Sequence, residues 1–310
     1  MINELSILVP VYNDDASRLV RELCRQAGLV PGLRYEVVVF DDGSSDAASV
    51  AASVSLGSLP CCRYVRAEHH PCRSAMRNAM SSCALYEWRL MVDARLTPVR
   101  PDFLMRYLQS GVAYGEAVCG GVCVDGGNDE RRLYASNLRF RYEKREERFH
   151  SVSFRRSKPY SSFRTTNFFY HRTVLERVPY DESILGYGYE DVMLGKCLRQ
   201  AGVRVLHIDN PVAYTTFEGN ACYLDKVDEA LLTLSGLSAS LRGYSPLERA
   251  AGMLGSVGRR IVAVLFGVAG CRVRASLCGS RPRLWLFKLY KLGRYCSLRS
   301  GRSHARPVLL

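Results

Sequence analysis

The sequence contains no run of about 18 apolar residues, the length that a membrane-spanning helix needs. Its first residues, Met1 to Glu4, have neither the basic start nor the long apolar core of a secretory signal peptide. Its 12 cysteines are scattered, and Cys61, Cys62, Cys119 and Cys123 lack partners at the spacing of a zinc ribbon. We therefore expect reduced thiols in a cytosolic protein that is soluble or lies on a membrane surface.

Acidic residues are almost absent from the C-terminal part of the chain. Residues 239–310 hold 14 of the 43 Lys and Arg residues, and their only acid is Glu248. Residues 1–238 hold 29 basic and 29 acidic residues, so the formal net charge of +13 comes entirely from the last part. Such asymmetry usually marks a segment that meets an anionic surface. The rest of the composition is that of an ordinary globular protein.

Strands, turns and helices alternate from the start of the chain, with a helix expected from Asp14 and Asp15 to about Gly28. The segment 5–13 is apolar and ends at a proline-containing turn, and 35–40 is a second apolar strand. This alternation predicts an α/β domain with a mostly parallel sheet, in which ligands bind beyond the carboxyl ends of the strands. Asp41 and Asp42 lie at such an end, where they can accept hydrogen bonds from a base or ribose. The alternative is a Gly-Ser turn that is capped by Asp.

Two adjacent carboxylates, Glu190 and Asp191, stand between a Gly-Tyr-Gly-Tyr bend and a helix with apolar residues at helical spacing. At the start of a helix, backbone N–H groups and the helix dipole keep a carboxylate ionised. Such a carboxylate can act as a fixed base. The simpler interpretation is that the pair only caps a surface helix.

Three motifs occur in order along the chain: V-P-V-Y-N at 9–13, D-D-G-S at 41–44 and G-Y-G-Y-E-D at 186–191. Together they resemble the family 2 glycosyltransferases of the GT-A fold, over roughly residues 4–230. The resemblance implies a Rossmann-like nucleotide-binding sheet with helices on both faces. It also implies that four residues surround the base and ribose of a nucleotide-sugar donor: Pro10, Tyr12, Asp41 and Asp42.

The same resemblance assigns roles to the carboxylate pair and to later residues. It implies that Asp191 takes the proton from the acceptor hydroxyl, with Glu190 as support or acceptor contact. Arg73 and Arg77, on the basic face of a helix, fit the family pattern near the phosphates, and Asn167 lies in a turn that faces the donor sugar. The histidine pair at 69–70 has no matched carboxylate, so we interpret it as solvated rather than metal-bound.

Arg95 stands where the resembled family usually has a metal ligand. Family members typically carry Asp-x-Asp here, and the second Asp binds the Mg²⁺ or Mn²⁺ that bridges the diphosphate. This chain keeps Asp93, the ribose contact, but has Arg95 in the second position and Tyr214 where a ligating His is expected. His207 is interpreted as a packed strand residue. An Arg repels a divalent ion but can neutralise a diphosphate, so Arg95 replaces the metal, marks a degenerate site or points away as a surface residue.

The C-terminal extension contains two segments that mix apolar and basic residues. Residues 259–270 are apolar but too short to span a membrane, and residues 284–292 combine aliphatic, aromatic and basic side chains. Such helices can lie in a bilayer interface with their cations toward anionic headgroups. The alternative is a packing helix with a basic outer face. We expect no nucleic-acid partner, because no nucleic-acid module accompanies the charge.

The sequence therefore predicts a GT-A domain over residues 1–238 and a basic, helical, membrane-surface tail over 239–310. The expected activity is inverting transfer from a nucleotide sugar, most simply a UDP-sugar, to a glycan or lipid-linked acceptor. We expect this peripheral enzyme at the inner face of the plasma membrane, in cell-surface polysaccharide synthesis. Two alternatives stay open: a degenerate member of the fold that binds a partner glycosyltransferase or the membrane, and a nucleotidyltransferase, which would need metal carboxylates that this chain lacks.

Overall fold

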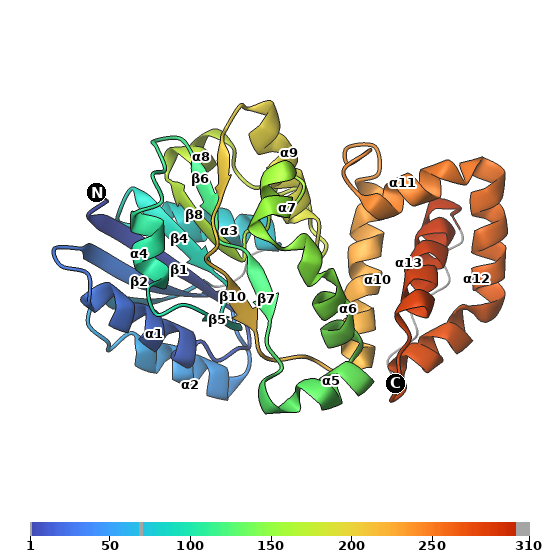
Figure 1. The fold of residues 1–310 in the computed structure, drawn as a ribbon, viewed down its shortest axis with the longest axis horizontal. Coiled ribbons are helices and arrows are strands. Elements are labelled where there is room, and N and C mark those ends of the chain that lie inside the picture. Colours follow the sequence, from blue (N-terminus) through green and yellow to red (C-terminus); the bar gives the residue numbers. More distant parts are fainter. Residues whose placement is uncertain (1, 68–70, 302–310) are drawn as a thin grey trace. The chain divides into compact units, whose positions relative to one another are not determined.

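The computed structural model describes residues 2–67 and 71–301, shown as a ribbon in Figure 1. The histidine pair at 69–70 lies outside the described residues. The chain forms two compact units, each built from separate segments. The first unit comprises Met1–Asp125, Glu146–Leu185 and Glu190–Thr216, and the second comprises Gly126–Arg145, Gly186–Tyr189 and Phe217–Leu310.

The first unit is organised around a seven-stranded sheet with the strand order β3-β2-β1-β4-β8-β6-β9. Strand β1 pairs in parallel with β2 and β4, β2 with β3, and β6 with β9, whereas β8 runs antiparallel to β4 and β6. The strands span Glu4–Val11 (β1), Arg34–Asp41 (β2), Cys62–Arg66 (β3), Trp88–Val92 (β4), Ala117–Cys119 (β6), Asn167–His171 (β8) and Val205–His207 (β9). The predicted α/β architecture with a mostly parallel sheet is confirmed.

A second, three-stranded sheet stands beside the exit of β4. It has the order β5-β10-β7, formed by Leu96–Pro98, Val212–Tyr214 and Val122–Val124. Tyr214 pairs with Leu96, so the residue predicted to replace a metal-ligating His stands next to the strand that follows Arg95. Sheet pairing therefore brings two distant departures from the family pattern into one neighbourhood.

Helices cover both faces of the large sheet because its central strands are apolar on both sides. Side chains alternate between faces along a strand, so Ile7 and Val9 join one core while Leu8 joins the other. The first core includes residues of α1, α2 and α4, and the second includes residues of α3, α8 and α9. These helices span Ser17–Gly28 (α1), Ala47–Leu56 (α2), Arg73–Ser82 (α3), Phe103–Leu108 (α4), Thr173–Arg177 (α8) and Glu190–Gln200 (α9). A short α7 (Val152–Ser157) completes the unit.

The second unit is built from helices and connecting loops, and its described residues form no strand. A small apolar core joins α6, α10, α12 and α13 through Leu138, Leu224, Leu277 and Phe287. Asp228 of α10 accepts hydrogen bonds from Arg274 of α12 and from Tyr290 of α13, which ties these three helices together. The helices span Glu130–Ser136 (α5), Leu138–Glu146 (α6), Asn220–Gly236 (α10), Pro246–Met253 (α11), Gly255–Cys278 (α12) and Leu284–Arg299 (α13).

Helix α12 is longer than the sequence indicated. The segment 259–270, expected to be too short to span a membrane, lies inside a helix of 24 residues. Within the described residues this is the one helix that is long and apolar enough to cross a membrane, by length and composition only. The expectation of a short segment was wrong because less apolar residues on either side continue the same helix. Only 17% of its apolar window is buried.

The boundary between a GT-A domain and a tail at residue 238 stays a prediction. The compact units do not follow that boundary, because residues 126–145 and 186–189 belong to the helical unit together with the chain from residue 217 onward. The excess positive charge of the tail therefore folds with α5, α6 and α10.

Candidate active site

Arg77 of α3 is the centre of a charged cluster in the first unit. Its Nη1 atom lies 3.3 Å from Glu190 Oε1 and 3.3 Å from Asp191 Oδ1, and its Nη2 atom lies 3.6 Å from Asp93 Oδ1. The guanidinium also lies over the ring of Tyr180, 5.6 Å from the ring centre. Three carboxylates from two separate parts of the chain therefore converge on one cation.

The arginine at this centre is almost fully buried, with 3% of its side chain exposed. Burial by itself lowers the pKa of Arg77, but the charge of Asp191, together with those of Asp93 and Glu190, raises its pKa overall. The guanidinium is therefore a permanent cation in a weakly solvated place. A buried cation of this kind needs its carboxylate partners, and they need it.

The carboxylate of Asp191 is held from two sides. Its Oδ1 atom accepts a short hydrogen bond from the Thr165 hydroxyl and faces Arg77, while its Oδ2 atom lies 3.2 Å from the Thr165 backbone nitrogen, which donates to it. Thr165 is fully buried and Asp191 is 23% exposed. This geometry fixes the carboxylate in one orientation while leaving part of it open to solvent.

Glu190 is more enclosed than its neighbour. Its Oε1 atom faces Arg77 and lies 3.6 Å from Nη1 of the half-exposed Arg73. Its Oε2 atom is buried and has no hydrogen-bond partner among the described residues, and the same is true of Asp93 Oδ1. Buried polar atoms are normally satisfied, so these two oxygens keep hydrogen-bonding capacity that no described residue uses.

The backbone before α9 explains why the carboxylate pair begins a helix. Gly188 has a φ of 87° and Tyr189 a φ of 70°, so two consecutive residues are left-handed. Glycine tolerates this conformation, but a tyrosine is strained in it. The turn ends the loop abruptly and starts α9 at Glu190, so that both carboxylates lie in its first turn. The predicted arrangement at this motif is thus present.

Asp41, the first residue of the D-D-G-S turn, is held by hydrogen bonds from its own turn and from β3. Asp41 is fully buried, and its two oxygens accept from the Ser44 backbone N–H at 2.8 Å and from the Tyr64 hydroxyl at 2.6 Å. Although burial raises the pKa of Asp41, the bonds from Ser44 and Tyr64 lower it overall. Both carboxylate oxygens are therefore used within the protein, as a turn residue would use them.

Asn13 makes the matching connection from β1. It has a φ of 51°, and its side-chain oxygen accepts from the backbone N–H groups of Ser45 at 2.8 Å and Asp46 at 2.9 Å. The sequence motif contained Asn13, but its role went unassigned because local sequence does not show that the two turns meet. Nearby, Tyr12 is 58% exposed. Pro10 and Asp42 are half-buried, so these three predicted base and ribose contacts line the accessible side of the turn.

Arg95 does not join the cluster at Arg77. It is 47% exposed, and its Nε atom donates a short hydrogen bond to Asp14 Oδ1, just after β1. Asp93, two residues earlier, faces Arg77 instead. Neither the sequence motifs nor their spacing indicated Asp14 as the partner of Arg95.

The residues at this edge do not fit a divalent metal ion. Over residues 2–67 and 71–301, no three His, Cys, Asp or Glu side chains gather as they would around such an ion. The carboxylates of Asp93, Glu190 and Asp191 form ion pairs with the Arg77 guanidinium. The carboxylate of Asp14 forms an ion pair with Arg95. Hard divalent cations need several oxygen ligands that are free of such cations.

Two further predicted residues lie in the interior. Asn167 is 1% exposed, and its amide accepts from the Tyr107 hydroxyl and donates to the carbonyls of Gly121 and Asn210. All its hydrogen-bonding groups thus serve the packing of β8, while its contact with a donor sugar stays a prediction. His207 is 3% exposed in β9, as expected for a packed strand residue.

A family model described as glycosyl transferase family 2 matches residues 6–178, more than half of the chain. The chain belongs to glycosyl transferase family 2. This family member has the GT-A fold, as predicted, and the family's defining chemistry is the transfer of a sugar from a nucleotide-sugar donor. No curated protein matches the sequence significantly.

Solved structures agree on the fold. One is the mannosyltransferase PcManGT from Pyrobaculum calidifontis in complex with GDP-Man and Mn²⁺, with a TM-score of 0.57 and 15% identity over 96% of this chain and 86% of that chain. Another is GalNAc-T7 with UDP, GalNAc and Mn²⁺, with a TM-score of 0.52 and 13% identity over 83% of this chain and 53% of that chain. At these identities the likeness establishes the fold of the family member and leaves its substrates to be inferred.

Proposed function

We propose that this family 2 glycosyltransferase transfers a sugar from a UDP-sugar to a glycan or lipid-linked acceptor with inversion at the anomeric carbon. The observation that carries the proposal is the fixed carboxylate of Asp191, held by Thr165 and Arg77 at the start of α9. A base held in one orientation is what attack by an acceptor hydroxyl requires.

The proposed reaction is a single displacement. Asp191 takes the proton of the acceptor hydroxyl while the hydroxyl oxygen forms a bond to the anomeric carbon. The bond between that carbon and the diphosphate oxygen breaks, and the nucleoside diphosphate leaves with the electron pair. Because attack and departure occur on opposite faces in one step, the configuration inverts. Arg77 and Thr165 position the base, and Glu190 supports the cluster.

The charge of the leaving diphosphate needs a cation, and Arg95 is best placed to supply it. Arg77 is buried and already faces three carboxylates. Arg95 is half-exposed, lies at the exit of β4 and has one ion-pair partner among the described residues, Asp14. We propose that its guanidinium turns from Asp14 to the diphosphate when the donor binds, since bidentate bonds to phosphate oxygens are strong. Both neighbours described above were solved with Mn²⁺, so a metal contribution is the competing explanation.

Calorimetric titration with UDP, UDP-sugars and GDP-mannose, with and without Mn²⁺, tests this assignment. The wild-type protein is expected to bind a nucleotide equally well with and without Mn²⁺. Arg95→Asp is expected to bind weakly without the metal and to gain Mn²⁺-dependent binding, because it places a carboxylate beside Asp14. Arg100→Asp, a change of equal charge on an exposed ion pair outside the cluster, is the matched control. Mn²⁺-dependent binding by the wild type would contradict the arginine role.

A second candidate function is a degenerate family member that binds a partner or a membrane without transferring sugar. The joint departures at Arg95 and Tyr214 favour it, since the sheet pairing places Tyr214 opposite Leu96, the residue that follows Arg95. Absence of nucleotide binding in every titration would support this reading and overturn the transferase proposal.

We also propose that the protein binds the inner face of the plasma membrane through α12. The exposed side chains Val257, Ile261, Val264, Leu265 and Val268 follow helical spacing, so they form one apolar face. An exposed stripe of this kind marks an interaction site, and the basic residues of the same unit favour an anionic bilayer.

Substitution on this face is a sharper test than deletion, because removing residues 239–310 would open the core that α12 and α13 share with α10. The triple variant Ile261→Ser, Leu265→Ser, Val268→Ser is expected to lose co-sedimentation with anionic vesicles. The matched control replaces three exposed apolar residues of the first unit, Leu29, Leu85 and Val99, with Ser. Equal binding by both triple variants would remove α12 as the membrane contact.

A further inference from the structure

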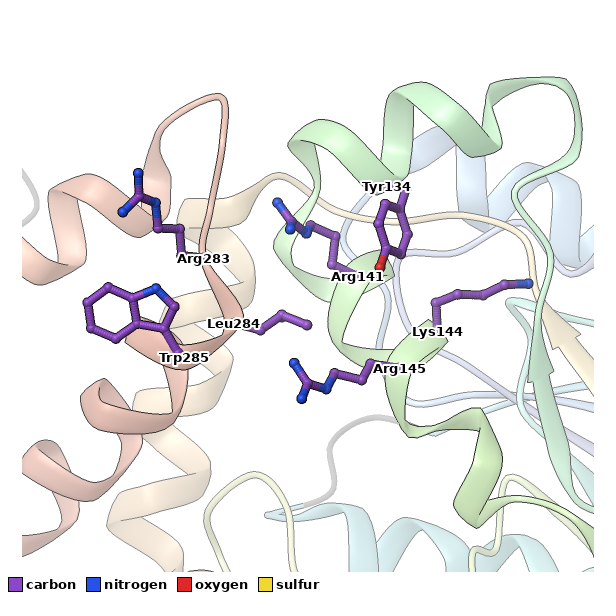
Figure 2. Close-up of a pocket in the computed structure, with 7 residues that line it drawn as sticks. All are labelled: Tyr134, Arg141, Lys144, Arg145, Arg283, Leu284 and Trp285. Carbon is purple, nitrogen blue, oxygen red and sulfur yellow. The ribbon is translucent and has the colours of Figure 1, made fainter.

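The second unit contains a cavity of about 580 Å³ whose lining residues include none of the cluster at Arg77. Four cations line it: Arg141, Lys144 and Arg145 of α6, and Arg283 just before α13. Figure 2 shows the side chains of Arg141 and Arg145 extending from α6 toward the start of α13. No carboxylate is among its lining residues in the part of the chain that the structure describes.

The walls of this cavity are held in place by contacts within the same unit. Arg141 Nη1 donates a 2.7 Å hydrogen bond to the carbonyl of Pro282, and the Arg141 guanidinium lies 5.4 Å from the ring centre of Tyr134. Leu138 and Leu284 join the small core that α6 shares with α13. The cations on the two sides are therefore positioned by the fold and not only by flexible stems.

Most of the positive charge in the cavity is not neutralised by the protein. Lys144 lies 3.3 Å from Glu130, which is about half exposed. Arg145 and Arg283 form no ion pair with any residue that the structure describes, and Arg141 Nε is buried without a hydrogen-bond partner there. Converging like charges repel one another unless an anion joins them. The cavity therefore has the charge distribution of an anion site.

The side chains indicate which anion fits. Guanidinium groups make bidentate hydrogen bonds to phosphate oxygens, and three of the four cations are arginines. Trp285, 56% exposed, and Tyr134, 49% exposed, offer ring faces for an attached carbon skeleton. A volume of about 580 Å³ is within the range of small-molecule sites and holds a headgroup more readily than a polymer.

We infer that this pocket binds a phosphate or diphosphate group, carried either by a lipid headgroup or by a soluble phosphate compound. All the residues concerned belong to the second unit, so the inference does not rest on the proposed transfer reaction. It adds a second anion site to the site that the donor diphosphate would use.

Intrinsic fluorescence gives a direct test, because the chain has two tryptophans and the other one, Trp88, is buried in β4. Inorganic pyrophosphate is expected to change the Trp285 emission saturably, whereas sodium chloride at matched ionic strength leaves it unchanged. The variant Arg145→Gln, Arg283→Gln is expected to weaken the apparent affinity about tenfold or more, since two charge-assisted contacts are lost. Trp285→Phe should abolish the signal.

A matched double variant distinguishes the loss of pocket contacts from the loss of net positive charge. Arg242 and Arg249 are exposed residues of the same unit outside the cavity, so Arg242→Gln, Arg249→Gln removes the same charge. It is expected to leave pyrophosphate affinity within about twofold of wild type. Equal weakening by both double variants, or no saturable response in the wild type, would overturn the site.

Vesicles identify the source of the phosphate. Phosphatidylcholine vesicles with and without phosphatidylglycerol are added to the wild type and to both double variants. A Trp285 response that needs phosphatidylglycerol and is lost only in Arg145→Gln, Arg283→Gln assigns the pocket to a lipid headgroup. If pyrophosphate changes the Trp285 emission, this response is lost only in Arg145→Gln, Arg283→Gln, and vesicles give no response, the pocket is assigned to a soluble phosphate compound. Loss of nucleotide binding in Arg95→Asp would leave both results unaffected.

Discussion

Two arginine-rich regions of this protein use the same side chain in opposite ways. In the first unit, Arg77 is buried among the carboxylates of Asp93, Glu190 and Asp191, so three opposite charges surround it. In the second unit, Arg145 and Arg283 line a cavity together with two further cations. The residue type is the same in both regions. The surroundings decide whether an arginine is paired with carboxylates inside the protein or is available to bind an anion.

The difference has an energetic meaning. A buried, paired charge cannot lose its partner without leaving an uncompensated charge in a weakly solvated place. An exposed cation that repels its neighbours contributes little to folding and becomes favourable only when a ligand arrives. The first region should therefore respond to mutation through catalysis and stability, and the second through binding.

The largest expected effect is on catalysis. Asp191→Asn keeps the shape of the side chain and removes the base, so we expect the rate of UDP release from the bound UDP-sugar, with water as the acceptor, to fall about 10²- to 10⁴-fold. Glu190→Gln is the paired variant. A larger loss in Glu190→Gln than in Asp191→Asn would transfer the role of base to Glu190.

Removal of the central cation comes next. Arg77→Ala leaves Asp93 and Asp191 without their ion-pair partner and Glu190 with only the half-exposed Arg73, and we expect the free energy of unfolding to fall by about 3 to 5 kcal/mol. Urea unfolding followed by circular dichroism measures it. Arg73→Ala, at an exposed partner of the same Glu190, should cost about 1 kcal/mol or less. Similar losses in the two variants would show that Arg77 is not the centre of the cluster.

Arg155 sharpens the comparison because it is a buried cation that forms no ion pair with a carboxylate of the described residues. It is 4% exposed and donates to the carbonyls of Cys119, Gly120 and Ile208, and its Nη1 lies 3.1 Å from His207 Nδ1. An arginine only donates, so Nδ1 accepts and the neutral imidazole donates from Nε2 to the Pro159 carbonyl. A proton on His207 would place two donors against each other.

This arrangement predicts that the folded state becomes less stable in acid. Burial lowers the pKa of His207 to about 4, the Pro159 carbonyl opposes this shift, and Arg155 adds to it. Because the folded-state pKa lies below the unfolded value of about 6.5, the unfolded chain binds the proton more readily. The contribution of neutral His207 to the free energy of unfolding is fully present above about pH 6.5. It falls by about 3 kcal/mol as the pH drops to about 4.

Unfolding free energies of wild type and His207→Gln between pH 7 and pH 4 measure this contribution. The glutamine amide can still accept from Arg155 and donate to Pro159 but does not titrate, so the variant should lose less stability on acidification. Parallel pH profiles for the two proteins would assign the acid sensitivity to other groups.

The smallest expected effect completes the comparison. The double variant Arg145→Gln, Arg283→Gln should have a free energy of unfolding within about 0.5 kcal/mol of the wild-type value, since neither arginine has an ion pair among the described residues. A slight gain in stability would agree with relief of charge repulsion. A loss as large as that of Arg77→Ala would show that the pocket cations are structural.

Local sequence was sufficient for part of the site. The E-D pair at 190–191 begins a helix as expected, because glycine and a following helical apolar pattern determine where a helix can start. The strand before Asp41 and the turn after it are likewise readable, since the apolar run and the Gly-Ser turn are local signals. The partners of these residues were not readable. Thr165 contacts Asp191, Asn13 contacts the turn after Asp41, and Asp14 contacts Arg95, in each case from a distant segment, and no periodic pattern marks such contacts.

The sequence by itself determined the α/β class, the family and the concentration of positive charge after residue 238, because periodicity, motif order and composition need no knowledge of contacts. Only the tertiary structure decided which charges meet. It placed Arg77, and not Arg95, among the carboxylates, and it joined residues 126–145 to the basic tail. The physical reason is that charge pairing depends on distance and burial, and both are set by the packing of segments that are far apart in the chain.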